Sequence, residues 1–258
     1  MAIARSRFYP IPGESLVWGA VLTAWALALA LPLLDLGEVV SHDAVLEGHT
    51  LPSLPALLLF LAAWQVMTGA MMLPSSLPMV GLFARASREQ ARPRLAFAAF
   101  ITAYFAVWTS FALLALFSDA GLHQLIERWR WLDDRPWLIA GSVLVLAGGF
   151  QFSPLKERCL NACRNPVAFL WHHYQRGLRP AWLLGLRHGL FCLGCCWALM
   201  LTMFAVGVGS LAWMAALTGV MLIEKTAPRG RRLVPVVGIA LIVTGAVVLL
   251  SPGWLPLL

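Results

Sequence analysis

Sulfur-containing side chains are concentrated in two segments of the chain that carry few polar residues. The first, WQVMTGAMMLPSSLP, contains Met67, Met71 and Met72. The second, RHGLFCLGCCWALMLTM, contains six candidate metal ligands: His188, Cys192, Cys195, Cys196, Met200 and Met203. Thioether, thiolate and imidazole groups suit Cu(I) and, less well, Zn(II). Because ionisable groups at membrane depth are usually functional, the two segments predict a metal site inside a membrane protein.

Spacing supports the second segment as one face of a helix. Residues four apart share a helix face, and four of the candidates follow this interval: His188, Cys192, Cys196 and Met200. Cys195 lies on the neighbouring row. The alternative interpretation is that Cys and Met are ordinary apolar fillers of membrane helices, and it applies to the methionines of the first segment as well.

A third sulfur cluster, QFSPLKERCLNACRNP, lies between two apolar runs. Cys159 and Cys163 are four residues apart and are flanked by arginines, whose positive charge favours the thiolate form. Ser153 and Pro154 are typical of the start of a short helix. We expect a surface thiol pair that transfers metal or undergoes redox chemistry; two loop thiols without a function are the alternative.

Composition predicts an all-α polytopic membrane bundle. Hydrophobic residues make up 60% of the chain and charged residues 12%, against about 25% charged in soluble domains. A membrane-spanning helix needs about 20 apolar residues, and uncharged runs occupy residues 16–34, 50–84, 95–117, 136–155, 189–223 and 233–250. The run 189–223, extended by 180–188, suits two helices. We therefore expect about seven transmembrane helices in a single integral membrane domain, residues 1–258, with no separate soluble domain.

Loop charge predicts the orientation of this bundle. Residues 85–94 and 156–179 are rich in arginine, whereas residues 35–50 carry only acidic charges. The positive-inside rule then places the N-terminus in the cytoplasm and the C-terminus in the periplasm of a bacterial inner membrane. The net charge of +7 arises in these loops, and no basic patch interleaved with exposed aromatics indicates nucleic-acid binding.

The second apolar run contains Pro74 and Pro78, each of which removes a backbone donor and disfavours a continuous helix. We expect this helix to be kinked or broken just after Met72. Broken helices at membrane depth usually line a cavity or a site. Since Met67 and Cys192 have similar predicted depths, the two sulfur segments are expected to meet.

Four motifs resemble a known family. They are W-x-x-M-x-x-A-M-M-x-P at residues 64–74, K-x-x-C-L-x-x-C-R at 156–164, H-G-x-x-C-x-G-C-C-W-x-L-M at 188–200, and Glu224-Lys225. Together they resemble a bacterial family of predicted metal-binding integral membrane proteins, a domain of unknown function, over roughly residues 55–250. The resemblance implies metal binding and membrane location but supplies no reaction or substrate.

The sequence thus predicts a membrane protein that handles copper, with zinc as the alternative metal. Transport or delivery, involving lipid and a metal-donor or metal-acceptor protein, is the first hypothesis. A membrane-embedded copper oxidase or oxygenase, or a thiol–disulfide electron carrier, is the alternative. The sequence contains neither a Walker loop nor a nucleophile elbow, so it gives no indication of ATP-driven transport or of hydrolase chemistry. The predicted metal ligands are Met67, Met71, Met72, Cys159, Cys163, His188, Cys192, Cys195, Cys196 and Met200.

Overall fold

The computed structural model describes residues 12–33, 53–128, 131, 135–206 and 210–251. These residues form ten α-helices, one short 3-10 helix and no strand, which confirms the all-α prediction. The helices are α1 (Pro12–Leu33), α3 (Leu54–Met71), α4 (Leu73–Ala86), α5 (Pro93–Arg128), α7 (Pro136–Phe150), α8 (Pro154–Arg164), α9 (Pro166–His173), α10 (Leu178–Val206), α11 (Leu211–Thr226), η1 (Gly230–Arg232) and α12 (Leu233–Leu250).

Four described helices are long and apolar enough to cross a membrane. The candidate spans are Leu54–Met71, Pro93–Leu122, Leu178–Met203 and Gly230–Leu250. A fifth is obtained when α7 and α8, which are bent by 64° at their junction, are counted as one broken span. The predicted count of seven is larger than this and stays a prediction.

The helix α5 differs from the sequence-based expectation at its C-terminal end. The third uncharged run ends at residue 117, and the charged residues that follow it favour a loop, but α5 continues to Arg128. The segment LHQLIER consists largely of good helix formers. Charged residues end an apolar run without ending a helix.

The second apolar run is divided into two helices at Met72, which separates α3 from α4. Pro74 lies in the first turn of α4, where its missing N–H costs no intrahelical hydrogen bond. The hydroxyl of Ser75 donates to the Met72 carbonyl at 2.9 Å. Pro78 lies inside α4. A bend caused by these prolines stays a prediction.

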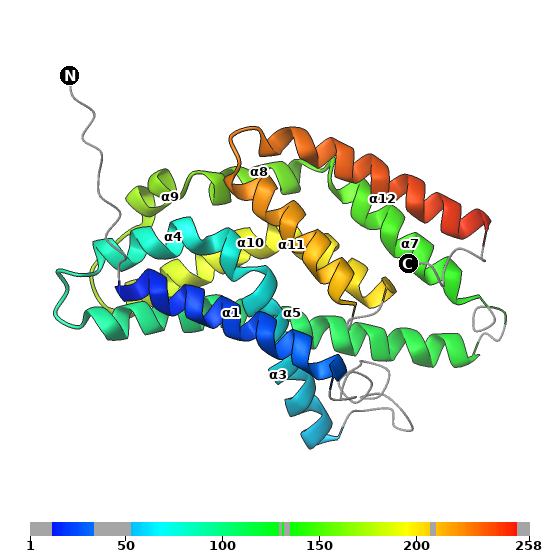
Figure 1. Ribbon diagram of the computed structural model, residues 1–258, viewed down its shortest axis with the longest axis horizontal. Helices are drawn as coiled ribbons and strands as arrows, with labels where there is room; N and C mark the ends of the chain where they lie inside the picture. The colour runs from blue at the N-terminus through cyan, green and yellow to red at the C-terminus, as the bar shows by residue number, and fades with distance from the viewer. Residues whose placement is uncertain (1–11, 34–52, 129–130, 132–134, 207–209, 252–258) are drawn as a thin grey trace.

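Close helix contacts around α10 and α7 organise the bundle (Figure 1). The α7 and α12 helices run side by side, and a Cβ added at Gly148 would lie 2.7 Å from the Gly238 carbonyl oxygen. In the same way, a Cβ at Gly189 of α10 would lie 2.9 Å from Cγ2 of Val107 in α5. Small residues of this kind let membrane helices approach closely. The central α10 therefore has packed neighbours on several sides.

The short helix α8 begins as the sequence predicts. Ser153 is its N-cap, and the Ser153 hydroxyl oxygen accepts a hydrogen bond from the Lys156 backbone N–H at 3.0 Å. Pro154 follows at the first helical position, for which its fixed backbone angle is suited. This start directs α8 along α10 and brings the third sulfur cluster to the second.

Candidate metal site

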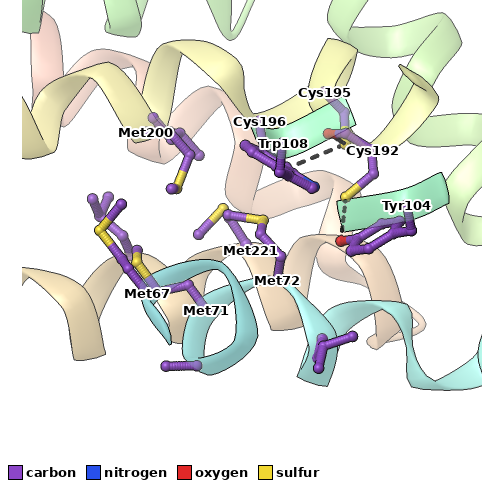
Figure 2. Close-up of a cluster of buried hydrophobic side chains, with 14 of the residues drawn as sticks. Met67, Met71, Met72, Tyr104, Trp108, Cys192, Cys195, Cys196, Met200 and Met221 are labelled. Carbon is purple, nitrogen blue, oxygen red and sulfur yellow. Dashed lines mark hydrogen bonds between the residues drawn. The ribbon is translucent and has the colours of Figure 1, made fainter. Parts of the chain in front are cut away.

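The methionine side chains are all buried in the described part of the chain. Each is at most 4% exposed: Met67, Met71, Met72, Met79, Met200, Met203, Met214 and Met221. Figure 2 shows that five of them gather in the core with three cysteines: Met67, Met71, Met72, Met200 and Met221 with Cys192, Cys195 and Cys196. These residues come from α3, α10, α11 and the α3–α4 junction. The two sulfur segments therefore belong to one buried core cluster.

Cys192 lies within a buried polar network. Its sulfur is 3.2 Å from the Tyr104 hydroxyl and 3.9 Å from the Ser76 hydroxyl. The ammonium group of Lys225 donates to this sulfur at 3.2 Å and to the Ser75 hydroxyl at 3.0 Å. A buried ammonium group needs such acceptors, because its desolvation is costly. The Cys192 sulfur is thus both an acceptor for Lys225 and a candidate metal ligand.

Cys195 of α10 lies between a second thiol of α10 and a thiol of α8. The Cys195 sulfur lies 3.4 Å from the Cys196 sulfur and 3.9 Å from the sulfur of Cys163 in α8. Cys163 is partly exposed, whereas the other four cysteines are buried, and all five are free thiols. The three sulfurs therefore extend from the half-buried face of α8 into the core.

Cys159 does not lie at the surface as predicted. It is 6% exposed, and a Cβ added at Gly194 of α10 would lie only 2.5 Å from its sulfur. The face of α8 that carries Cys159 packs into the space left by the missing side chain of Gly194. The expectation of a surface thiol pair is therefore wrong for Cys159, and Cys163 is the member of that pair that reaches another thiol.

His188 lies in a layer of aromatic rings. Its ring centroid is 5.5 Å from that of Tyr104 and 6.0 Å from that of Phe100, both nearly parallel, and 6.1 Å from that of Phe169. The Nε2 atom of His188 is buried and has no hydrogen-bond partner among the described residues. His188 and Cys192, neighbours in the i,i+4 stripe predicted on α10, therefore both lie against Tyr104 of α5.

The donor set decides which metals fit. Among the residues that the structure describes, no group of three or more His, Cys, Asp and Glu side chains is arranged to hold a metal ion. A site with three or more ligands among these residues would therefore need the buried thioethers. Thioethers and thiolates are soft ligands that select Cu(I) and are poor ligands for Mg, Ca and Mn.

A family model described as PpoB2, copper chaperone, matches residues 61–248. The chain belongs to the PpoB2 copper chaperone family. No curated protein and no solved structure matches it. The PpoB2 match includes all the predicted ligands and leaves out α1. Membership of the family supports a copper-related role and agrees with the metal-related family that the sequence motifs resemble.

Within the PpoB2 match, the sequence reasoning missed the polar partners of Cys192. In the sequence, Glu224 and Lys225 stand out only as a charged pair that ends the apolar run 189–223, but both side chains are buried, at 1% and 5% exposure. An ionisable residue next to an apolar run was the available signal for Lys225. Nothing local to Tyr104 indicates its contact with Cys192, 88 positions further along the chain.

A buried ion pair fixes α8 in place within the same matched region. The Lys156 ammonium lies 2.7 Å from the Glu224 carboxylate, and each side chain is 1% exposed. At the other end of α8, Arg164 donates to the Glu224 backbone carbonyl and, at 2.8 Å, to that of Ala227. These contacts tie α8 to the end of α11 and so position Cys163 beside α10.

Proposed function

We propose that this chain is a membrane-embedded copper chaperone that binds Cu(I) on its buried thioethers and thiols and exchanges it with a partner protein. The observation that carries the proposal is the gathering of five buried methionines and three buried cysteines in one core (Figure 2). This core lies within the residues matched by the copper chaperone family. The proposed ligands are Met67, Met71, Met72, Met200, Cys192, Cys195 and Cys196, with His188 adjoining them.

The burial of the cluster suits Cu(I) as cargo. Neutral thioethers let a monovalent ion leave water without adding further buried charge, while a cysteine thiolate balances its single positive charge. Both ligand types are soft and favour Cu(I) over harder ions. Because the methionines and the cysteines of α10 are 0–4% exposed, bulk water is kept from the ion.

We propose seven membrane spans, with the N-terminus in the cytoplasm and the C-terminus in the periplasm of a bacterial inner membrane. The alternation of basic and acidic loops supports this orientation. Four or five of the described helices have the length and composition of spans. In this arrangement α8 faces the cytoplasm, where Cys163 meets a metal-donor or metal-acceptor protein.

Copper analysis of the protein purified in mild detergent tests this function. We expect near-stoichiometric copper in the native protein and loss of most of it in the double variant Cys192→Ser, Cys196→Ser. The control is Cys159→Ser, which removes a buried thiol that packs against Gly194. Native copper content in the double variant would reject the α10 site, and zinc in place of copper would change the assigned metal.

A second measurement asks whether the thioethers and thiols form one site. Met67→Leu preserves size and hydrophobicity, so folding should survive while one sulfur is lost. Residues that act in one unit are not additive, so Met67→Leu combined with Cys192→Ser should weaken Cu(I) affinity by less than the sum of the two single losses. Met214→Leu is the matched control, since Met214 is about 10 Å along α11 from Met221. Full additivity would indicate two separate sites.

A further inference from the structure

The half-buried thiol of Cys163 stands apart from the other cysteines because it is both partly exposed at the protein surface and next to another thiol. Its sulfur is 3.9 Å from that of Cys195, which in turn is 3.4 Å from that of Cys196. The other four cysteines are buried. A copper ion that passes between water and the core on sulfur ligands therefore meets Cys163 at the surface.

The separation of the two sulfurs suits a shared ion. A metal–thiolate bond is about 2.3 Å long, so two thiolates bound to one ion lie at most about 4.6 Å apart. The observed 3.9 Å between Cys163 and Cys195 is within this limit. Both thiols can bind the same ion without movement of the backbone.

Three contacts along α8 hold this separation. Lys156 pairs with Glu224 near the start of the helix. Cys159 fills the space beside Gly194 in the middle. Arg164 donates to two carbonyls at the end of α11. Cys163 is therefore carried on a helix that is fixed against both α10 and α11.

We infer that Cys163 and Cys195 form an exchange site, through which Cu(I) passes between a thiol carrier at the face of α8 and the buried cluster. This inference rests on the proposed function and adds to it the route by which copper enters or leaves the buried cluster. The carrier is defined by its chemistry: a thiol compound or a protein thiol that holds Cu(I).

Each step of the exchange is a ligand substitution. The Cys163 sulfur forms a bond to the copper of the carrier, the bond from copper to the carrier sulfur breaks, and the proton of the Cys163 thiol ends on the released carrier thiol. Cys195 then takes the ion from Cys163 in the same way: its sulfur bonds to copper, the bond from copper to the Cys163 sulfur breaks, and the proton of the Cys195 thiol passes to Cys163. Copper stays Cu(I) throughout, so no oxidant or reductant is consumed.

Release of copper to a water-soluble Cu(I) chelator, bathocuproine disulfonate, tests the exchange site. The full chain in mild detergent is loaded with Cu(I) under ascorbate, and the colour of the chelate reports the rate. We expect Cys163→Ser to keep the native copper content but to release copper at least about tenfold more slowly. A tenfold slower release corresponds to an increase of about 1.4 kcal/mol in the activation barrier. Cys163→Met, which restores a soft ligand, should recover part of the rate, and Met214→Leu, which changes a buried sulfur residue outside the proposed ligand set, should release copper at the native rate.

The outcomes separate this inference from the proposed function. A native protein that binds no copper overturns both. Native copper content with a native release rate in Cys163→Ser overturns the exchange site alone. Loss of bound copper in Cys163→Ser also overturns it, because Cys163 would then be part of the storage site.

Discussion

The ion pair between Lys156 and Glu224 should be among the most sensitive points of the fold. Both side chains are 1% exposed and their charged atoms are 2.7 Å apart. Glu224→Gln removes the negative charge while keeping the shape of the side chain. The Lys156 ammonium is then buried without an opposite charge, so we expect a large loss of stability.

The magnitude follows from the geometry. At 2.7 Å and an effective dielectric constant of about 20, the attraction is about 6 kcal/mol. Desolvation of both groups offsets much of this attraction, but a variant that removes one partner retains the desolvation cost of the other. Breaking a buried pair in this way typically costs about 3–5 kcal/mol. At about 2–4 °C per kcal/mol for a chain of this size, the thermal midpoint should fall by about 6–20 °C.

The assay is loss of helical circular dichroism on heating in detergent. The double variant Lys156→Met, Glu224→Leu should recover most of the stability, since it leaves no charge unpaired. Glu157→Gln is the matched control, because Glu157 pairs with Arg231 on the exposed side of α8, where both side chains are more than half exposed. An exposed pair contributes about 1 kcal/mol or less. A Glu224→Gln midpoint that matches the control would refute the reasoning.

Three further outcomes are expected. Gly194→Ala places a Cβ 2.5 Å from the Cys159 sulfur, so the thermal midpoint of this variant should fall by the equivalent of about 1–3 kcal/mol. Adding Cys159→Ala should restore the midpoint. A midpoint that does not recover would mean that the two residues do not compete for space. Tyr104→Phe removes the hydroxyl that lies 3.2 Å from the Cys192 sulfur. Competition with a chelator should show a Cu(I) affinity weakened about tenfold or more, at unchanged stoichiometry. A native Cu(I) affinity would exclude a supporting role for the hydroxyl. Alkaline phosphatase fused after Leu258 should be active, since the C-terminus is proposed to be periplasmic, whereas activity only from a fusion within residues 85–94 would reverse the topology.

The helices were the most predictable part of the fold, because a long apolar run leaves the backbone few alternatives in a membrane. The run 180–223, which the sequence divides into two helices, corresponds to α10, Leu178–Val206, and α11, Leu211–Thr226. The end of α5 was not predicted, because hydropathy detects where a helix leaves the apolar phase and not where its hydrogen bonds stop. Gly207 and Gly209, residues typical of a turn between two such helices, lie outside the described residues.

The candidate site was predictable in its residue types and less so in its contacts. Periodicity places Cys192 and Cys196 on one face of α10, but it says nothing about which other helices approach that face. The contacts of Cys192 with Tyr104 and Lys225 join positions 88 and 33 residues apart. Such contacts depend on helix packing, for which a single sequence carries no periodic signal.

The burial of the methionines has a consequence for the chemical lifetime of the protein. Oxidants convert methionine to its sulfoxide, a polar group that disrupts a packed core and no longer offers a thioether lone pair to a metal. At 0–4% exposure, the thioethers of the described residues are reached by dissolved peroxide only when the bundle opens. Their oxidation should therefore require opening of the bundle, so that the durability of the donor set depends on the stability of the fold as well as on the concentration of oxidant.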